Sequence, residues 1–158
     1  MGPVLLCDDG SADAASAVVA AARLLEPRDA VALHVWQLPS AAMGTMAGFQ
    51  VIALPPEVDE QAATAAERLA QQAADRAGQA GFDARPLAVR AVGPAWQVIL
   101  EVGRQHDAAV IVVGARGLTG LKHVLLGSVS EKVARHADRP VLILHPTTGD
   151  AELEPEQS

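Results

Sequence analysis

The stretch VVGARGLTGLKHVLLGSVSEKV, residues 112–133, places four glycines and two serines between an apolar run and the expected start of a helix. The run that leads into it, AAVIVVG (108–114), contains no polar side chain, which is typical of a strand covered on both faces. The residues after Gly127 favour a helix that starts near Ser128 and ends near His136. A strand, a glycine-rich connection and a helix in this order are typical of α/β folds.

Four more segments of the chain have the composition of strands. They are VLLC (4–7), AVALHVW (30–36), PVLILH (140–145) and, as a weaker strand with some alternation, ARPLAVRAV (84–92). Short and nearly continuous apolar runs of this kind fit strands that lie between two layers of helices.

Helical patterns separate these strands. The expected helices span residues 12–25, 57–80, 94–104 and 128–136. Ser11 or Asp9 can cap the first helix, and Gly81 stops the second, which is rich in residues of high helix propensity. Pro94 suits the first position of the third helix, because its fixed φ is already helical.

The alternation of strands and helices predicts one doubly wound, Rossmann-like α/β domain. It has a five-stranded parallel sheet with helices on both faces and right-handed crossovers. We expect this domain to span residues 1–146, interrupted by a flexible loop at 39–57 that contains three prolines and two glycines. The tail at 147–158 carries four acidic residues and no basic one, and we expect it to be disordered.

The composition excludes several classes of protein. Without the acidic tail, 15 acidic residues face 12 basic ones, and the basic residues are scattered, so no nucleic-acid partner is expected. No apolar run approaches the roughly 18 residues that span a bilayer, and no basic region followed by an apolar stretch occurs near residue 1, so we expect no export signal. Cys7 is the only cysteine, and the five histidines lack metal-ligand spacing. We therefore expect a cytoplasmic protein with no membrane partner and no bound structural metal.

The glycines and serines of residues 112–133 suggest an anion site. Ligands of open α/β sheets bind outside the carboxyl ends of the strands, and Gly114 and Gly117 would let backbone approach a ligand closely. The helix start at Gly127, Ser128 and Ser130 offers free N–H groups to a phosphate. The residues alone leave other interpretations open, since the glycines can shape a turn and Ser128 with Glu131 can form a capping box.

Neither the P-loop pattern nor the dinucleotide fingerprint occurs in the chain. Instead, Gly114 and Gly117 are separated by two residues, and nine more precede Gly127-Ser128. This spacing resembles the G-2x-G-9x-G-[S/T] nucleotide motif of the universal stress protein family. The resemblance extends from VLLCDDGS to GSVSEKVARHADRPVLILH and leaves out only the 39–57 loop and the acidic tail.

The resemblance implies an adenine-nucleotide site. Asp9 would contact the adenosine, the backbone of Val35 would meet the adenine, the residues after the fourth strand would wrap ribose and phosphates, and those of the last helix start would hold the outer phosphates. The nucleotide-binding residues implied in this way are Cys7, Asp8, Asp9, Val35, Val113, Gly114, Ala115, Arg116, Gly117, Gly127, Ser128, Val129 and Ser130. Asp9 with Gly10 and Ser11 could also form only a turn and a helix cap.

Position 8 departs from the family pattern, which has an uncharged residue there. A second carboxylate at Asp8 would repel a polyphosphate unless it points away, binds through Mg²⁺ or takes up a proton.

The function that we predict from this resemblance is regulatory binding of ATP, with or without Mg²⁺, or of AMP or another adenine nucleotide. No catalytic residue is assigned, because a positioned general base and a Mg²⁺ cluster are missing from the pattern, and any ATP hydrolysis is expected to be slow. The alternative is a dimeric interaction module that does not retain nucleotide. An enzyme acting on an adenylate intermediate is a third possibility, although its usual Ser-Gly-Gly loop is absent. The last strand, Pro140 to His145, would pair two copies into a homodimer.

Overall fold

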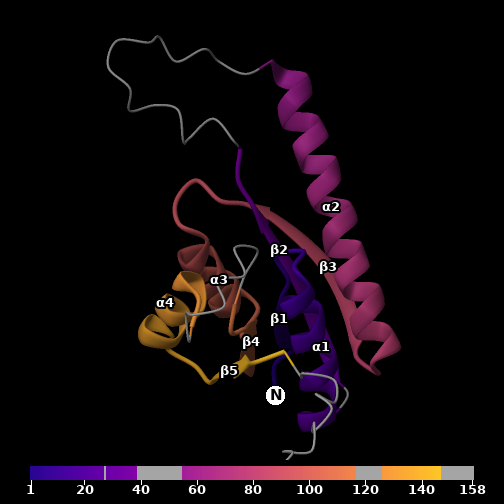
Figure 1. Cartoon of the computed structure of the whole chain (residues 1–158), viewed down its shortest axis with the longest axis vertical. Coiled ribbons are helices and arrows are strands. Elements are labelled where there is room, and N and C mark those ends of the chain that lie inside the picture. The colour runs from indigo at the N-terminus through magenta and orange to yellow at the C-terminus, as the bar shows by residue number, and fades with distance from the viewer. Residues whose placement is uncertain (27, 39–54, 117–125, 147–158) are drawn as a thin grey trace, which may run out of the picture.

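The chain folds into a single parallel sheet with two helices on each face (Figure 1). This computed structural model describes residues 1–26, 28–38, 55–116 and 126–146. The elements in chain order are β1 (Val4–Cys7), α1 (Ala12–Leu24), β2 (Asp29–Trp36), α2 (Pro56–Gln79), β3 (Asp83–Arg90), α3 (Ala95–Gln105), β4 (Val110–Gly114), α4 (Ser128–His136) and β5 (Val141–Leu144). All nine elements expected from the sequence are confirmed, with boundaries that differ by a few residues.

The strand order is β3-β2-β1-β4-β5, and every neighbouring pair is parallel. The chain builds outward from β1 through β2 to β3, and then crosses to the other side of β1 to place β4 and β5. Leu5 in the central strand pairs with Val31 on one side and with Ile111 on the other. The strand order therefore reverses between β1 and β4, and this confirms the doubly wound fold.

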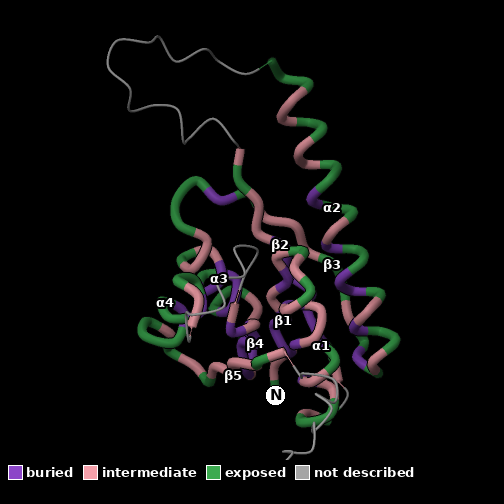
Figure 2. Tube along the Cα trace, viewed as in Figure 1, coloured by how far each residue is buried: buried purple, intermediate pink, exposed green. Residues whose placement is uncertain are grey.

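Two apolar layers hold the helices to the sheet, and Figure 2 shows the buried residues along the strands and the inner helix faces. Because alternate residues of a strand point to opposite faces, Leu5 packs toward α3 and α4, whereas Val4 and Leu6 pack toward α1. Ala32 of β2 meets the alanine-rich face of α2. Alanine allows this long helix to lie close to the sheet.

The helix starts agree only partly with the sequence-based expectations. Ser11 caps α1, since its Oγ accepts from the Ala14 N–H at 3.1 Å. Pro94 is the N-cap of α3 and not its first helical residue. The capping box that Ser128 and Glu131 could form is not the one present, because the cap residue of α4 is Gly127, which has no side chain to accept a bond.

Two of the expected segments lie mainly outside the described residues. The expected flexible loop at 39–57 lies outside them at positions 39–54, but Pro56 and Glu57 already belong to α2. The acidic tail at 147–158 lies wholly outside them. Along the described ranges, no helix has both the length and the apolar character needed to cross a membrane.

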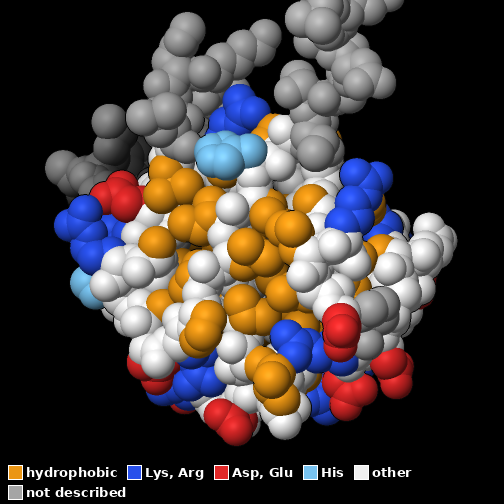
Figure 3. Space-filling view, turned by 90° about the horizontal axis from the view of Figure 1, so that it is seen from below, with side chains coloured by type: hydrophobic (Ala, Val, Ile, Leu, Met, Phe, Trp, Pro, Cys, Tyr) orange, Lys and Arg blue, Asp and Glu red, His pale blue; other side chains and the backbone are white. Residues whose placement is uncertain are grey.

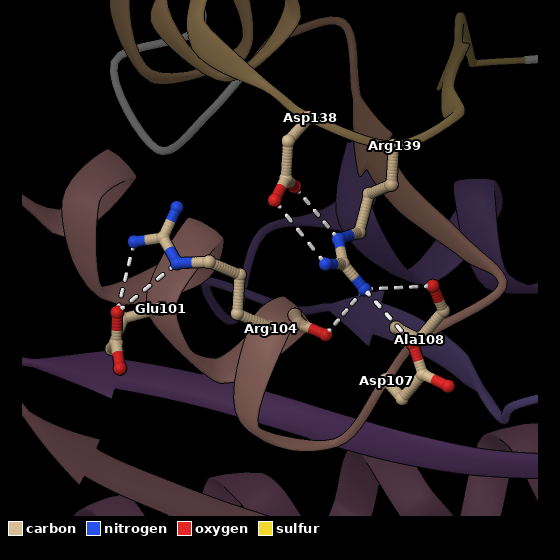
Figure 4. A network of polar contacts seen from close by, with 7 residues as sticks. Glu101, Arg104, Asp107, Ala108, Asp138 and Arg139 are labelled. Carbon is tan, nitrogen blue, oxygen red and sulfur yellow. Dashed lines mark hydrogen bonds and ion pairs between the residues drawn. The ribbon is translucent and has the colours of Figure 1, made fainter.

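Arg139, in the connection between α4 and β5, binds the end of α3 and the connection that follows α3 (Figure 4). Its Nη1 donates to the carbonyl of Gly103 in the last turn of α3 at 2.7 Å and to that of Ala108 at 3.1 Å. Its Nε donates to Asp138 at 2.9 Å. The Gly103 carbonyl also accepts from the Ala108 N–H at 2.9 Å, so the guanidinium adds a second, charged donor there and supplies a donor to the Ala108 carbonyl.

Candidate functional site

A hollow of about 110 Å³ opens at the carboxyl ends of β1, β2 and β4, beside the point where the strand order reverses. Its lining residues are Cys7, Asp8, Asp9, Ala14, Leu33, Val35, Ala95, Ile99, Val113, Gly114, Arg116, Val129 and Ser130. Most of this wall is aliphatic, and the polar groups gather on the side of β1, β4 and α4. A hollow of this composition can hold an apolar ring at one end and a polar or charged group at the other.

The turn after β1 forms the first polar edge of the hollow. Asp9 Oδ1 accepts from the Ser11 N–H at 2.9 Å, and Ser11 caps α1. Gly10 has a φ of 84°, a left-handed conformation that glycine adopts without steric cost. Asp9 therefore serves both as the turn residue expected from the sequence and as part of the hollow's wall.

The Asp8 side chain points away from the hollow, toward α2. Its carboxylate forms an ion pair with Arg76 of α2 and accepts from the Gly10 N–H at 2.7 Å. Of the three arrangements expected from the sequence, this matches the one in which Asp8 points away.

The connection after β4 packs closely on the first turn of α1. A Cβ at Gly114 would lie 3.5 Å from the Ala14 nitrogen and 3.4 Å from the Arg116 carbonyl oxygen, so a larger side chain would press on α1. Arg116 reaches the same turn, with its Nε 3.2 Å from Asp13 Oδ2. This places a partly exposed cation at the rim of the hollow, near the start of α4.

The start of α4 supplies the second polar edge. The N–H groups of the first helical residues have no partner inside a helix, and here these residues are Ser128, Val129 and Ser130. Among the described residues, no side chain caps them. The Gly127 N–H is already used, since it donates to the Ala115 carbonyl at 2.7 Å. The Ser130 hydroxyl donates to the Gly114 carbonyl at 2.6 Å and remains able to accept.

The structure brings most of the implied nucleotide-binding residues together. Those that line the hollow are Cys7, Asp8, Asp9, Val35, Val113, Gly114, Arg116, Val129 and Ser130. Ala115 is buried and, like Gly127 and Ser128, does not line it. Gly117 lies outside the described residues.

Four lining residues were missed by the sequence-based prediction: Ala14, Leu33, Ala95 and Ile99. Ala95 and Ile99 are spaced one helical turn apart at the start of α3, and Leu33 lies two residues before Val35 on the same strand face. These spacings were visible in the sequence. They indicate wall residues only when it is known that α3 covers the hollow beside the end of β2.

Cys7 is a wall residue without reactive character. Burial, together with the neighbouring Asp8 carboxylate, raises the pKa of the Cys7 thiol above its ordinary value. The thiol therefore stays protonated at neutral pH, where the thiolate would be the nucleophile. Over the described ranges, no three His, Cys, Asp or Glu side chains gather as metal ligands would.

The model of the universal stress protein family matches residues 1–145, nearly the entire folded part of the chain. The chain belongs to the universal stress protein family. It is 32% identical to universal stress protein YxiE of Bacillus subtilis over 146 residues, which cover 89% of this chain and 97% of that protein. The family resemblance expected from the glycine spacing is thereby confirmed.

Solved structures of this family share the fold. A universal stress protein in complex with cAMP matches with a TM-score of 0.61 at 24% identity, over 92% of this chain and 98% of that one. The universal stress protein of Archaeoglobus fulgidus in complex with dAMP matches with a TM-score of 0.59 at 20% identity, over 90% of this chain and 97% of that one. At these identities, the likeness shows the fold, and the bound nucleotides are properties of those two proteins.

Proposed function

We propose that this universal stress protein binds an adenine nucleotide, preferentially ATP, and acts as a regulatory module. The observation that carries the proposal is the juxtaposition, in one hollow, of an aliphatic wall and the uncapped N-terminus of α4. Leu33, Val35 and Ile99 offer a surface for the adenine ring. The N–H groups at the start of α4 and the Arg116 guanidinium offer partners for phosphate oxygens.

Two family members with the same fold are described as complexes with cAMP and dAMP, which supports an adenylate as the ligand class. Among adenine nucleotides we propose ATP over AMP, because the second and third phosphates would extend along the N-terminus of α4. Bound Mg²⁺ would be held mainly by those phosphates.

The proposed role is regulation and not rapid turnover. Of the two aspartates that line the described part of the hollow, Asp8 is paired with Arg76, and Asp9 accepts from the Ser11 N–H through its Oδ1. Efficient phosphoryl transfer needs a positioned base and protein ligands for the metal. We therefore propose that nucleotide occupancy biases an interaction, with slow hydrolysis at most.

Equilibrium binding tests the proposal directly. Isothermal titration of the full chain with ATP, AMP and adenosine, with and without Mg²⁺, should give saturable heat for at least one of them. Mass spectrometry of gently purified protein should detect a retained adenine nucleotide. Absence of both signals at millimolar nucleotide would instead favour the dimeric interaction module that binds no nucleotide, although the ion pair of Asp8 with Arg76 removes the charge repulsion that motivated that alternative.

We also propose a homodimer formed through β5. This strand is at the edge of the sheet, and its four residues are only half-buried. Figure 3 shows hydrophobic side chains gathered on the underside of the molecule, where Figure 1 places β5. An uncovered apolar edge strand favours pairing with a second copy. Light scattering at micromolar concentration should give twice the chain mass of 16.3 kDa, and a mass equal to one chain would contradict the dimer.

A further inference from the structure

A buried carboxylate lies at the carboxyl end of the central strand, next to the hollow. The Asp8 side chain is 2% exposed, so its charge is taken out of water. A buried charge is tolerated when it is paired and hydrogen-bonded. The groups that pair with the Asp8 carboxylate and hydrogen-bond to it therefore affect the electrostatics of the neighbouring hollow.

The pleat of the sheet determines which partner can reach Asp8. Cys7 belongs to the strand face that packs toward α3 and the hollow, and so do Leu33 and Val35 of β2. Asp8 and His34 alternate with these residues and point to the face covered by α1 and α2. Arg76 of α2 meets the carboxylate there, although 68 residues separate the two in the chain.

Every polar group of Asp8 has a partner. One carboxylate oxygen accepts from the Gly10 N–H and the other from Arg76. The backbone N–H of Asp8 donates to the Leu33 carbonyl at 2.9 Å, and its carbonyl accepts from His34 Nδ1 at 2.8 Å. The ion pair thus joins α2 to a turn whose next residue, Asp9, lines the hollow.

We propose that Arg76 is a positioning and charge-compensating residue that lets the site accept an anionic ligand despite Asp8. This rests on the proposed adenine-nucleotide function and assigns part of it to α2. Without Arg76, the carboxylate would stay buried and unpaired, or would turn toward the hollow and repel phosphates. Without Asp8, the Arg76 side chain, 34% exposed, can turn to solvent. Removing Arg76 and removing Asp8 should therefore have different effects on the binding of an anionic ligand.

This difference can be measured in a binding experiment with five proteins, the natural chain and four variants, and three ligands. The variants are Arg76→Met, Asp8→Asn and the double variant, where asparagine can still accept from the Gly10 N–H. Arg68→Met is the matched control, because it removes the same charge from an exposed position of the same helix. Adenosine, AMP and ATP are titrated into each, and circular dichroism establishes that each variant is folded.

We expect Arg76→Met to weaken ATP binding about tenfold, AMP binding less, and adenosine binding by less than about twofold, since the repulsion grows with ligand charge. Asp8→Asn should bind ATP at least as tightly as the natural chain, and the double variant should recover most of the loss. Arg68→Met should leave the ligand ranking unchanged.

Equal weakening of adenosine and ATP in Arg76→Met would overturn the proposal, because it would mark a purely structural role. Loss of ATP binding in a folded Asp8→Asn variant would also overturn it, and this variant keeps the test valid if Arg76→Met does not fold. If the natural chain binds no adenine nucleotide, the proposed function fails at the first titration. If it binds ATP and the variants do not follow this order, only the role of Arg76 fails.

Discussion

Replacing Arg139 by alanine is expected to lower the free energy of unfolding by about 3 kcal/mol, because two carbonyl groups would lose a charged donor. The Arg139 side chain is only 14% exposed, so water cannot easily replace it at the carbonyls of Gly103 and Ala108. The same contact holds the end of α3 to the connection that leads into β5. For a domain of this size, the midpoint of thermal unfolding should fall by about 6–12 °C.

Thermal and urea unfolding followed by circular dichroism would measure this effect. Arg104→Ala is the matched control, since the Arg104 guanidinium binds Glu101 (Figure 4) and both of these side chains are about half exposed. That variant should unfold close to the natural chain, because exposed ion pairs contribute little. An Arg139→Ala protein with an unchanged transition would show that the carbonyls find other partners.

Replacing Val129 by aspartate is expected to weaken ATP binding at least about tenfold, because a carboxylate would enter the region where the phosphates are proposed to lie. Val129 is 38% exposed, so the change creates no cavity in the core. An acidic residue in the first turn of a helix also favours the helix. A loss of affinity would therefore come from charge at the site and not from unfolding.

Titration calorimetry with ATP and adenosine would test the Val129→Asp variant. Adenosine should lose much less affinity than ATP. Ala134→Asp provides the control, since it adds the same charge to an exposed position of α4 that does not line the hollow. ATP binding that survives Val129→Asp unchanged would place the phosphates away from the start of α4.

The fold could be predicted because its determinants are local. The strands are short apolar runs of the length that a sheet covered on both faces requires, and the helices between them have strong propensities and clear ends, such as Ser11 at the start of α1. The glycine spacing after β4 identified the family from residues 114–128. The capping box that Ser128 could form with Glu131 is not formed, because Gly127 is the cap of α4 and Ser128 its first helical residue, although serine is the preferred cap residue of the two.

The site could be predicted only in part, since its wall comes from several elements. The turn after β1, the end of β4 and the start of α4 carry motifs, and their residues in the wall of the hollow were predicted. Ala95 and Ile99 of α3 carry none, and their role follows from the way α3 covers β2. The arrangement of Asp8 likewise stayed open among three possibilities, because the answer depended on a partner on a distant helix.

The amino-acid sequence by itself determined the order of strands and helices, the parallel sheet and the family, because periodicity and turn residues act over a few positions. Only the tertiary structure decided which way Asp8 points, that Arg76 meets it, and that the Gly127 N–H is already bonded. These contacts join residues far apart in the chain. Their geometry depends on how α2 and α4 pack on the two faces of the sheet, which no local pattern encodes.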